Sequence, residues 1–270
     1  MSRSTILLVM LTILFQTQTL FAKDKEITLG IVPQQSARVL FKNWMPLIKL
    51  INQQSGLNVV FRTDKSINDF QKKLAQGAYD ISYMNPLHYV VFNKVGYLPI
   101  VKAKGKRIKG IIVTHKDNPK TSLDQLKGKE MAFPSKGAFA ASVIIRGYLN
   151  EQLKLGITPK YVNSHDSVYD NVARKNFVAG GGVVRTFKSF KKSKSQNIKI
   201  LHTTKGYTPH AFAYNSKTVD LKAVKLLQSA LVKLSNTPEG KAALKKLKIK
   251  GWEAATDSQW DDVRALNLSL

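Results

Sequence analysis

The feature that most constrains this sequence is the stretch of residues 131–148, where a short apolar run leads through a polar turn into an alanine-rich segment. Residues 129–133 have the composition of the end of a buried strand, and residues 134–137 are typical of a turn. From position 138 onward the apolar residues recur at helical spacing, which predicts a helix over 138–153. A strand, a turn and a helix in direct succession indicate an α/β fold.

This turn also has the groups that hold a small anion. The first turn of any helix presents unpaired N–H groups and a partial positive charge. Here Ser135 adds a hydroxyl and Lys136 adds an ammonium group. Such a combination can bind an anion with few side chains. The alternative is an ordinary strand, turn and helix in which Ser135 only caps the helix.

The rest of the sequence repeats the alternation of strands and helices. Further strands are predicted at residues 26–33, 57–62, 79–84, 160–162 and 198–203, and further helices at 37–54, 66–76, 166–175, 221–235, 238–247 and 258–266. Residues 110–115 and 207–214 are candidates for two chain crossings between halves. Two α/β halves joined by two crossings form the plan of a hinged binding protein, although many α/β enzymes share it.

Polar residues follow several of the predicted strands, and ligands of open α/β sheets bind at that edge. Gln35 and Ser36 follow the first strand, and Asn85 follows the third. Arg185 comes after three consecutive glycines at 180–182, which permit close approach of backbone or ligand. Its planar guanidinium suits a phosphate group. His165 is predicted at the N-terminal end of a helix, from which an imidazole can donate to an oxyanion.

Each of these residues also has a structural interpretation. Asn85 can cap the helix that follows it, and Arg185 can face solvent. His165 can be a buried histidine with no ligand. Tyr83 and Tyr89 can pack in the core or face a cleft. The residue types alone leave both interpretations open.

Residues 1–22 have the pattern of an export signal, with Arg3, an apolar run over 6–15 and a cleavage end near Ala22. The run is too short to span a bilayer. The sequence has no cysteine, which excludes disulfides, thiol catalysis and a lipid-anchored cysteine. We therefore expect a periplasmic protein with a signal at 1–22, one lobe at 23–112 plus 206–270, and a second lobe at 113–205.

The formal net charge of +26 attracts anions of every kind. We do not expect nucleic acid as a partner, because an exported protein seldom meets it. The lysine-rich segments 102–109, 188–199 and 241–250 are interpreted as solvated faces.

The sequence argues against an enzyme. His165, Asp166 and Ser167 are neighbours at a helix start, so their side chains diverge and cannot form a nucleophile, base and orienter. No histidine pair has metal-ligand spacing, and no nucleotide-type phosphate loop follows a strand. We therefore expect no catalytic residues, no metal and no cofactor.

Four segments taken together resemble one family. Residues 80–89 (DISYMNPLHY), 133–142 (FPSKGAFAAS), 165–169 (HDSVY) and 180–186 (GGGVVRT) occur in this order in the phosphate/phosphite/phosphonate-binding proteins of ABC importers. The resemblance covers the whole chain after the signal. It implies a type II periplasmic binding protein fold of two lobes, each a mixed sheet flanked by helices, with the ligand between them.

The resemblance also implies site residues. The serine turn and following amides of the family correspond to Ser135, Lys136 and residues Ala138, Phe139 and Ala140, and its ligand-contacting histidine corresponds to His165. An aromatic residue of the first lobe corresponds to Tyr83 or Tyr89. This sequence departs from the family in having a single serine in the turn. It also lacks evident acidic residues for an amine, so an aminophosphonate is not expected.

These features predict a monomeric substrate-binding component of an ABC importer that binds phosphate, phosphite or an alkylphosphonate and delivers it to a permease in the inner membrane. The alternative is a sensing protein that regulates a membrane sensor kinase or cyclase. Both kinds of partner recognise closure of the lobes, so the sequence does not separate them.

Overall fold

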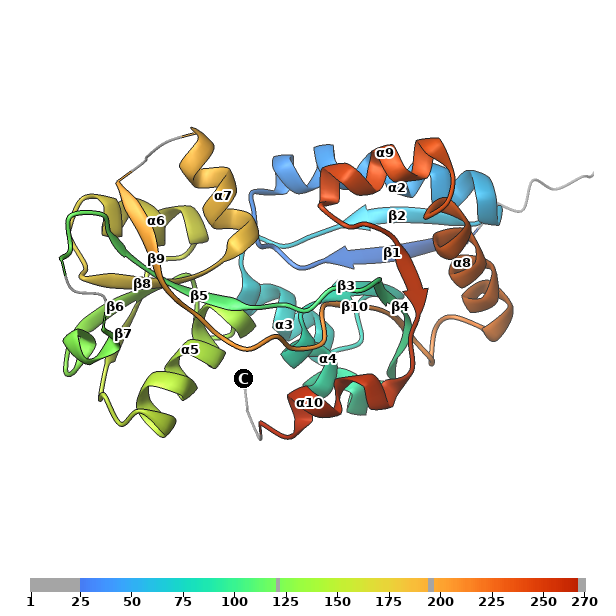
Figure 1. Cartoon of the computed structure of the whole chain (residues 1–270). Coiled ribbons are helices and arrows are strands. Elements are labelled where there is room, and N and C mark those ends of the chain that lie inside the picture. Colours follow the sequence, from blue (N-terminus) through green and yellow to red (C-terminus); the bar gives the residue numbers. More distant parts are fainter. Residues whose placement is uncertain (1–24, 120–121, 194–196, 267–270) are drawn as a thin grey trace, which may run out of the picture.

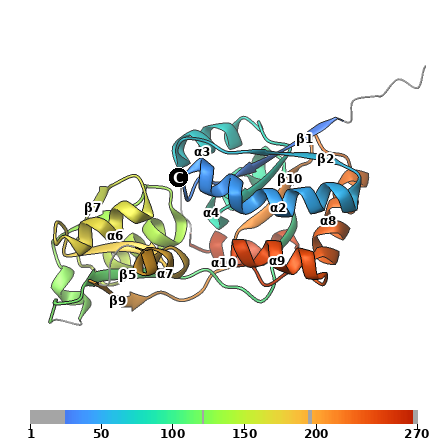
Figure 2. The same cartoon turned by 90° about the horizontal axis from the view of Figure 1, so that it is seen from above.

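The computed structural model describes residues 25–119, 122–193 and 197–266. The predicted signal at 1–22, with its cleavage near Ala22, lies outside the described residues. The described chain forms two sheets, each with helices on its faces, and the two halves lie side by side (Figures 1 and 2). The predicted α/β architecture of two lobes is confirmed. No described helix has both the length and the apolarity needed to cross a membrane.

The first lobe is built on a six-stranded sheet of order β11-β4-β10-β3-β1-β2. Its strands are β1 (Glu26–Ile31), β2 (Asn58–Arg62), β3 (Ile81–Met84), β4 (Tyr97–Ala103), β10 (Ala211–Asn215) and β11 (Trp252–Ala254). Its α-helices are α2 (Ala37–Ser55), α3 (Ile67–Ala75), α4 (Pro86–Phe92), α8 (Leu221–Leu234), α9 (Pro238–Leu247) and α10 (Asp261–Arg264), with short 3-10 turns at Asn93–Val95 and Asp257–Trp260. β1 runs parallel to β2 and β3, so all three strands end at one edge.

The second lobe is built on a five-stranded sheet of order β7-β6-β8-β5-β9. Its strands are β5 (Gly110–His115), β6 (Glu130–Phe133), β7 (Thr158–Tyr161), β8 (Ala179–Val183) and β9 (Ile198–Thr203). Its helices are α6 (His165–Ala173) and α7 (Val184–Ser193), a short 3-10 turn at Leu123–Leu126, and a helical segment over 139–152. β6 is parallel to β7 and β8, so these strands also end at one edge.

The amphipathic pattern of α2 forms as predicted. Leu40, Trp44, Leu47 and Ile51 are buried against the first sheet. Gly56 ends the helix with a positive φ of 70°, a conformation in which glycine carries no side-chain penalty. The spacing of these apolar residues thus fixes the position of the helix.

Two connecting segments join the lobes, at residues 104–109 and 204–210. Ile108 and Tyr207 pair across them and exchange two backbone hydrogen bonds, of 2.8 and 2.9 Å. The prediction that 110–115 crosses between lobes is wrong, because these residues form β5, which is paired on both sides in the second sheet. The apolar run Ile111 to Val113 is buried as in an interior strand. The predicted lobe boundary at 112/113 falls inside β5. The second crossing predicted at 207–214 is only partly right, because β10 begins at Ala211.

Gly181, in the middle of the three glycines, allows the helical segment 139–152 to lie directly on β8. A Cβ atom on Gly181 would stand 1.9 Å from the carbonyl oxygen of Ala141. The close approach predicted for these glycines is therefore an approach of backbone at Gly181, whereas Gly180 and Gly182 are approached most closely by the side chains of Val168 and Tyr169. The segment itself is helical, as predicted, but its first and last turns have π-type hydrogen bonding at Phe139–Val143 and Gly147–Gln152.

Candidate anion-binding site between the lobes

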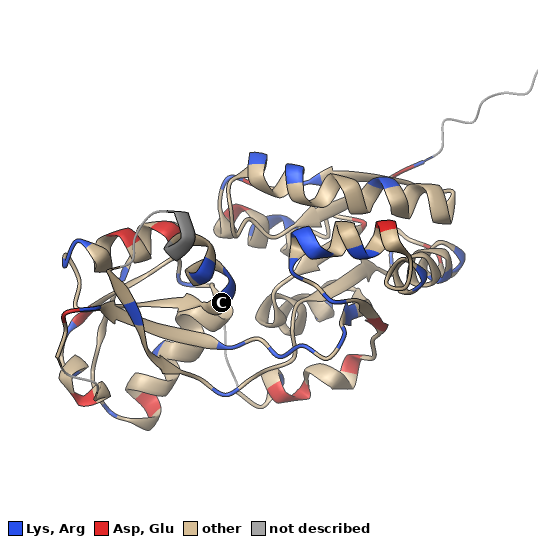
Figure 3. Cartoon of the chain, turned by 45° about the horizontal axis from the view of Figure 1, so that its top comes forward, with Lys and Arg blue, Asp and Glu red and all other residues tan. Residues whose placement is uncertain are grey.

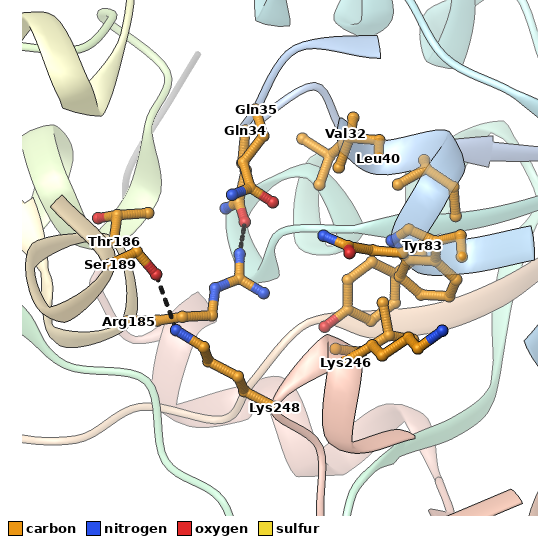
Figure 4. Close-up of a pocket in the computed structure, with 14 residues that line it drawn as sticks. Val32, Gln34, Gln35, Leu40, Tyr83, Arg185, Thr186, Ser189, Lys246 and Lys248 are labelled. Carbon is orange, nitrogen blue, oxygen red and sulfur yellow. Dashed lines mark hydrogen bonds between the residues drawn. The ribbon is translucent and has the colours of Figure 1, made fainter. Parts of the chain in front are cut away.

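The strand ends of the two lobes meet at a cavity of about 100 Å³. Val32, Gln34 and Gln35 follow β1, and Tyr83 belongs to β3. Arg185, Thr186 and Ser189 come from α7 of the other lobe (Figure 4). In the first lobe, α9 and its end contribute Lys246, Leu247 and Lys248, and the remaining lining comes from Ile31, Leu40, Asn43 and Trp44. A second cavity of about 150 Å³ shares Gln34, Tyr83 and Arg185 with the first.

Arg185 reaches from the second lobe to the first and lines both cavities. It lies in the first turn of α7, directly after β8 and the glycines. Its Nη2 donates a hydrogen bond to Oε1 of Gln34 at 2.6 Å. Within the described residues no carboxylate forms an ion pair with it. The guanidinium therefore has a neutral acceptor and no compensating negative charge.

Other cations surround Arg185. Lys106 lines the second cavity, and Lys248 lines the first and donates to Oγ of Ser189 across the gap at 2.8 Å. Burial, together with the positive charges of Arg185 and Lys248, lowers the pKa of Lys106 to about 8. No Asp or Glu lines either cavity among the described residues. Lys and Arg residues lie along the connecting segments and α9 (Figure 3). The space between the lobes is therefore positively charged.

Tyr83, Gln34 and His210 form a neutral wall. The rings of Tyr83 and His210 stack with centroids 5.0 Å apart. Nε2 of Gln34 lies 3.0 Å from Nε2 of His210 and donates to it, because an amide nitrogen cannot accept. Burial, with smaller effects of Arg185 and Lys106, holds the pKa of His210 well below its usual value. Burial raises the pKa of Tyr83 to about 12. Both side chains are neutral near pH 7.

His165 begins α6 in the second lobe, where Ser164 caps the helix. Its side chain is buried, and Nδ1 lies 3.4 Å from Oγ1 of Thr186, which lines the cavity. Burial, and secondarily the charge of Arg185, lowers the pKa of His165 to about 4. No hydrogen-bond partner of its Nε2 is found in the described part of the chain. His165 is thus a neutral imidazole behind the cavity lining.

The hydroxyl of Ser135 is buried, and no described residue gives it a hydrogen bond. The helix cap is Ala138, so the alternative in which Ser135 caps the helix is not observed. Phe139 and Ala140, in the first helical turn, have no acceptor within their own helix. A buried unsatisfied hydroxyl costs about 1–3 kcal/mol, which a bound acceptor would remove.

The structure brings only part of the predicted set to the cavities. Gln35, Tyr83 and Arg185 line them, whereas Ser36, Asn85, Tyr89, Ser135, Lys136, Ala138, Phe139, Ala140 and His165 do not. Asn85 caps α4 and donates through Nδ2 to the carbonyl of Gly137 at 3.3 Å, so it joins the lobes. Tyr89 packs on Trp260 and hydrogen-bonds to Asp257, which favours Tyr83 as the cleft aromatic.

Sequence reasoning missed the lysines of the site. Lys106, Lys246 and Lys248 line the cavities but lie in segments interpreted as solvated faces. The sequence shows the lysine clusters at 102–109 and 241–250, but it does not show that they lie beside the cavities. Among the described residues, no group of three or more His, Asp or Glu could hold a metal ion.

Comparison with known proteins identifies the fold and the family. PhnD1 from Prochlorococcus marinus, solved with methylphosphonate, superposes with a TM-score of 0.79 at 17% identity, covering 90% of this chain and 97% of that one. A binding component of an ABC phosphonate transporter from Pseudomonas aeruginosa gives 0.81 at 15% identity, covering 90% and 86%. A Xanthomonas citri protein solved with ATP gives 0.72 at 14% identity, covering 89% and 95%.

At these identities the structures show the fold, which is that of two-lobed periplasmic binding proteins, as predicted. The family model described as "ABC transporter, phosphonate, periplasmic substrate-binding protein" matches residues 29–260, which is most of the chain. The resemblance found in the sequence is therefore confirmed. The chain belongs to the family of periplasmic substrate-binding proteins of phosphonate ABC transporters.

Proposed function

We propose that this protein is exported to the periplasm and binds a phosphorus oxyanion (phosphate, phosphite or an alkylphosphonate) between its lobes for delivery to a membrane permease. The family is a substrate-binding component of transport, and we infer that this chain has no catalytic activity and acts as a monomer. A sensor kinase or cyclase as the partner stays an alternative, which a neighbouring gene for a permease or for a sensor would decide.

The observation that carries the proposal is the uncompensated guanidinium of Arg185. It lies between two cavities that no described carboxylate lines, beside Lys106 and Lys248. Like charges held this close without an anion are unfavourable. An oxyanion accepts two parallel hydrogen bonds from a guanidinium, and it would replace the single bond to Gln34.

Two further groups support the proposal. Ser135 follows β6 and His165 follows β7, and both strands end at the same edge as β8, which precedes Arg185. The unpartnered hydroxyl of Ser135 suits an anion that also contacts the first-turn amides. The relative from Prochlorococcus marinus was solved with methylphosphonate, and the one from Xanthomonas citri with ATP, so both bound phosphorus oxyanions.

Thermal unfolding with small anions tests the proposal. Ligand that binds only the folded state at 100 times Kd stabilises it by about 2.7 kcal/mol, which raises the melting temperature of a chain of this size by about 5–10 °C. We expect phosphate, phosphite or methylphosphonate to produce this rise and sodium chloride at equal ionic strength not to. No rise with any phosphorus oxyanion at millimolar concentration contradicts the proposal.

Ser135→Ala is expected to weaken binding of the stabilising anion by about tenfold, since one hydrogen bond to a charged group contributes about 1.5 kcal/mol. Ser142→Ala is the matched control, because the Ser142 hydroxyl is also buried and unpartnered but lies deeper in the helical segment. Calorimetric titration of both variants gives the comparison. Equal affinities of the two variants would show that the turn does not contact the ligand.

The pKa of His165 offers a test by NMR. A folded pKa of about 4 lies below the ordinary 6.5, so the neutral form favours folding. The associated stability is present above pH 6.5 and is lost as the pH falls toward 4. A bound anion favours the imidazolium and should raise this pKa by about one unit or more. His202, which stacks on Tyr148 away from both cavities, should not respond to the anion. An unchanged His165 pKa would place the anion elsewhere.

A further inference from the structure

The second inter-lobe cavity has both apolar and cationic lining. Arg185 and Gln34 line it, and it has a volume of about 150 Å³. Its apolar lining consists of Ile108, Val183, Val184 and Pro209. Its cationic lining comes from the connecting segment 104–109, as Lys106, Arg107 and Lys109. A ligand that Arg185 holds in this cavity therefore meets both apolar side chains and further positive charge.

The three cations of this segment that line the cavity are not equivalent. Arg107 pairs with Asp262 at 2.7 Å and donates to the carbonyl of Gly206, so its charge is compensated. Nζ of Lys106 donates to the backbone carbonyl of Lys248 at 3.3 Å and has no carboxylate partner among the described residues. Lys109 has neither an ion pair nor a side-chain hydrogen bond within the described chain. Two lysines in this cavity thus remain available to an anion.

An amine at this position would be repelled. Like charges repel and opposite charges attract, by an amount that solvent reduces in an open cavity. The interaction with Lys106 and Lys109 is therefore unfavourable for an ammonium group of the ligand and favourable for a carboxylate. The lining therefore discriminates by the charge at the far end of the ligand.

We propose that the second cavity binds a carboxylate attached through a short carbon chain to the phosphonate, so that the substrate class is the carboxyalkylphosphonates. This inference rests on the proposed function, because Arg185 is taken to hold the phosphonate. The carbon chain lies along Val183, Val184 and Ile108, and the carboxylate lies at Lys106 and Lys109.

The position of the two lysines also places the carboxylate of the ligand beside the connection between the lobes. Lys106 and Lys109 flank Ile108, whose backbone pairs with Tyr207 of the other connecting segment. The carboxylate would thus contact the segment about which the lobes must move. Burial and neighbouring cations hold the pKa of Lys106 at about 8, so an anion bound there should draw a proton onto it near pH 8.

Calorimetric titration of four phosphonates at pH 7 separates the contributions of the phosphonate, the carbon chain and the terminal charge to the affinity. Methylphosphonate has no extension, propylphosphonate has an apolar one, 3-phosphonopropionate ends in a carboxylate, and 2-aminoethylphosphonate ends in an ammonium. We expect 3-phosphonopropionate to bind at least tenfold more tightly than propylphosphonate. We expect 2-aminoethylphosphonate to bind at least tenfold more weakly than methylphosphonate.

Variants that remove the lysine charges test whether the preference for a carboxylate comes from Lys106 and Lys109. Combining Lys106→Gln with Lys109→Gln should reduce the affinity ratio of 3-phosphonopropionate to propylphosphonate to about twofold or less. Lys104→Gln is the control, because Lys104 is exposed on the same segment and lines neither cavity. The control should retain the full ratio.

The outcomes distinguish this inference from the function on which it rests. Equal affinities for propylphosphonate and 3-phosphonopropionate, or a ratio that survives in the double variant, overturn the carboxylate site while leaving phosphonate binding in place. Tighter binding of 2-aminoethylphosphonate than of methylphosphonate also overturns it. If none of the four compounds binds, the proposed function fails and the carboxylate site fails with it.

Discussion

Arg185→Gln is expected to weaken phosphonate binding at least 100-fold. Truncating one partner of a buried, hydrogen-bonded charge pair costs about 2–5 kcal/mol, and 100-fold corresponds to about 2.7 kcal/mol. Glutamine retains a polar amide but removes the charge and is two bonds shorter. The free protein should keep or gain stability, because Arg185 stands beside Lys106 and has no carboxylate partner in the described chain. Calorimetric titration and thermal unfolding measure the two effects.

The matched control is Arg174→Gln, an exposed arginine of the same lobe that lines neither cavity. It removes the same formal charge, so it reports the long-range electrostatic effect alone, which should stay within about threefold at physiological ionic strength. A loss of affinity without a loss of stability for Arg185→Gln identifies a ligand-binding role. A loss of stability with unchanged affinity would instead make Arg185 a structural contact between the lobes.

Gly181→Ala is expected to destabilise the second lobe by about 3 kcal/mol or more, because overpacking a core costs about 1–3 kcal/mol and the obstructing atom here is backbone. The new Cβ would stand 1.9 Å from the carbonyl oxygen of Ala141, so the helical segment 139–152 must move away from β8. The melting temperature should fall by about 6–12 °C. Phosphonate affinity should fall as well, because the same segment presents the first-turn amides.

Gly147→Ala is the control for this substitution. Gly147 lies in the same helical segment, and a Cβ there would meet nothing within 4 Å. Alanine in a helix is more stable than glycine by about 0.5–1 kcal/mol, so this variant should melt at the same or a slightly higher temperature. A Gly181→Ala protein as stable as the Gly147→Ala protein would show that the helix does not rest on β8 as described.

The sequence predicts the fold well where periodicity is strong. The helices α2, α3 and α9 begin and end within one residue of their predicted bounds, because apolar spacing and capping residues act locally. The helix α7 was missed, since only a few apolar residues interrupt its basic sequence. The strand β11 was missed because its three residues carry no periodic pattern. The misplaced crossing at 110–115 has a similar cause, because a short apolar run does not reveal its neighbours.

The site was predicted less completely than the fold. Gln35 and Tyr83 could be found because they lie at the ends of predicted strands, and Arg185 because it comes after the three glycines. Lys246 and Lys248 come from α9 and its end. This helix lies at the cavity because it packs against α2, and a local reading of the sequence does not reveal that packing. Nothing local in the sequence distinguishes these lysines from those on solvated faces. Asn85 has a polar side chain at the correct edge, but its partner is a backbone carbonyl of the other lobe.

A structure of the protein determined with the phosphonate that gives the largest thermal shift tests the central claim most directly. We predict that the phosphorus atom lies between the lobes, with its oxygens accepting hydrogen bonds from the guanidinium of Arg185. A phosphonate bound only to lysines on the outer surface, or a gap between the lobes left empty at saturating ligand, would contradict this account.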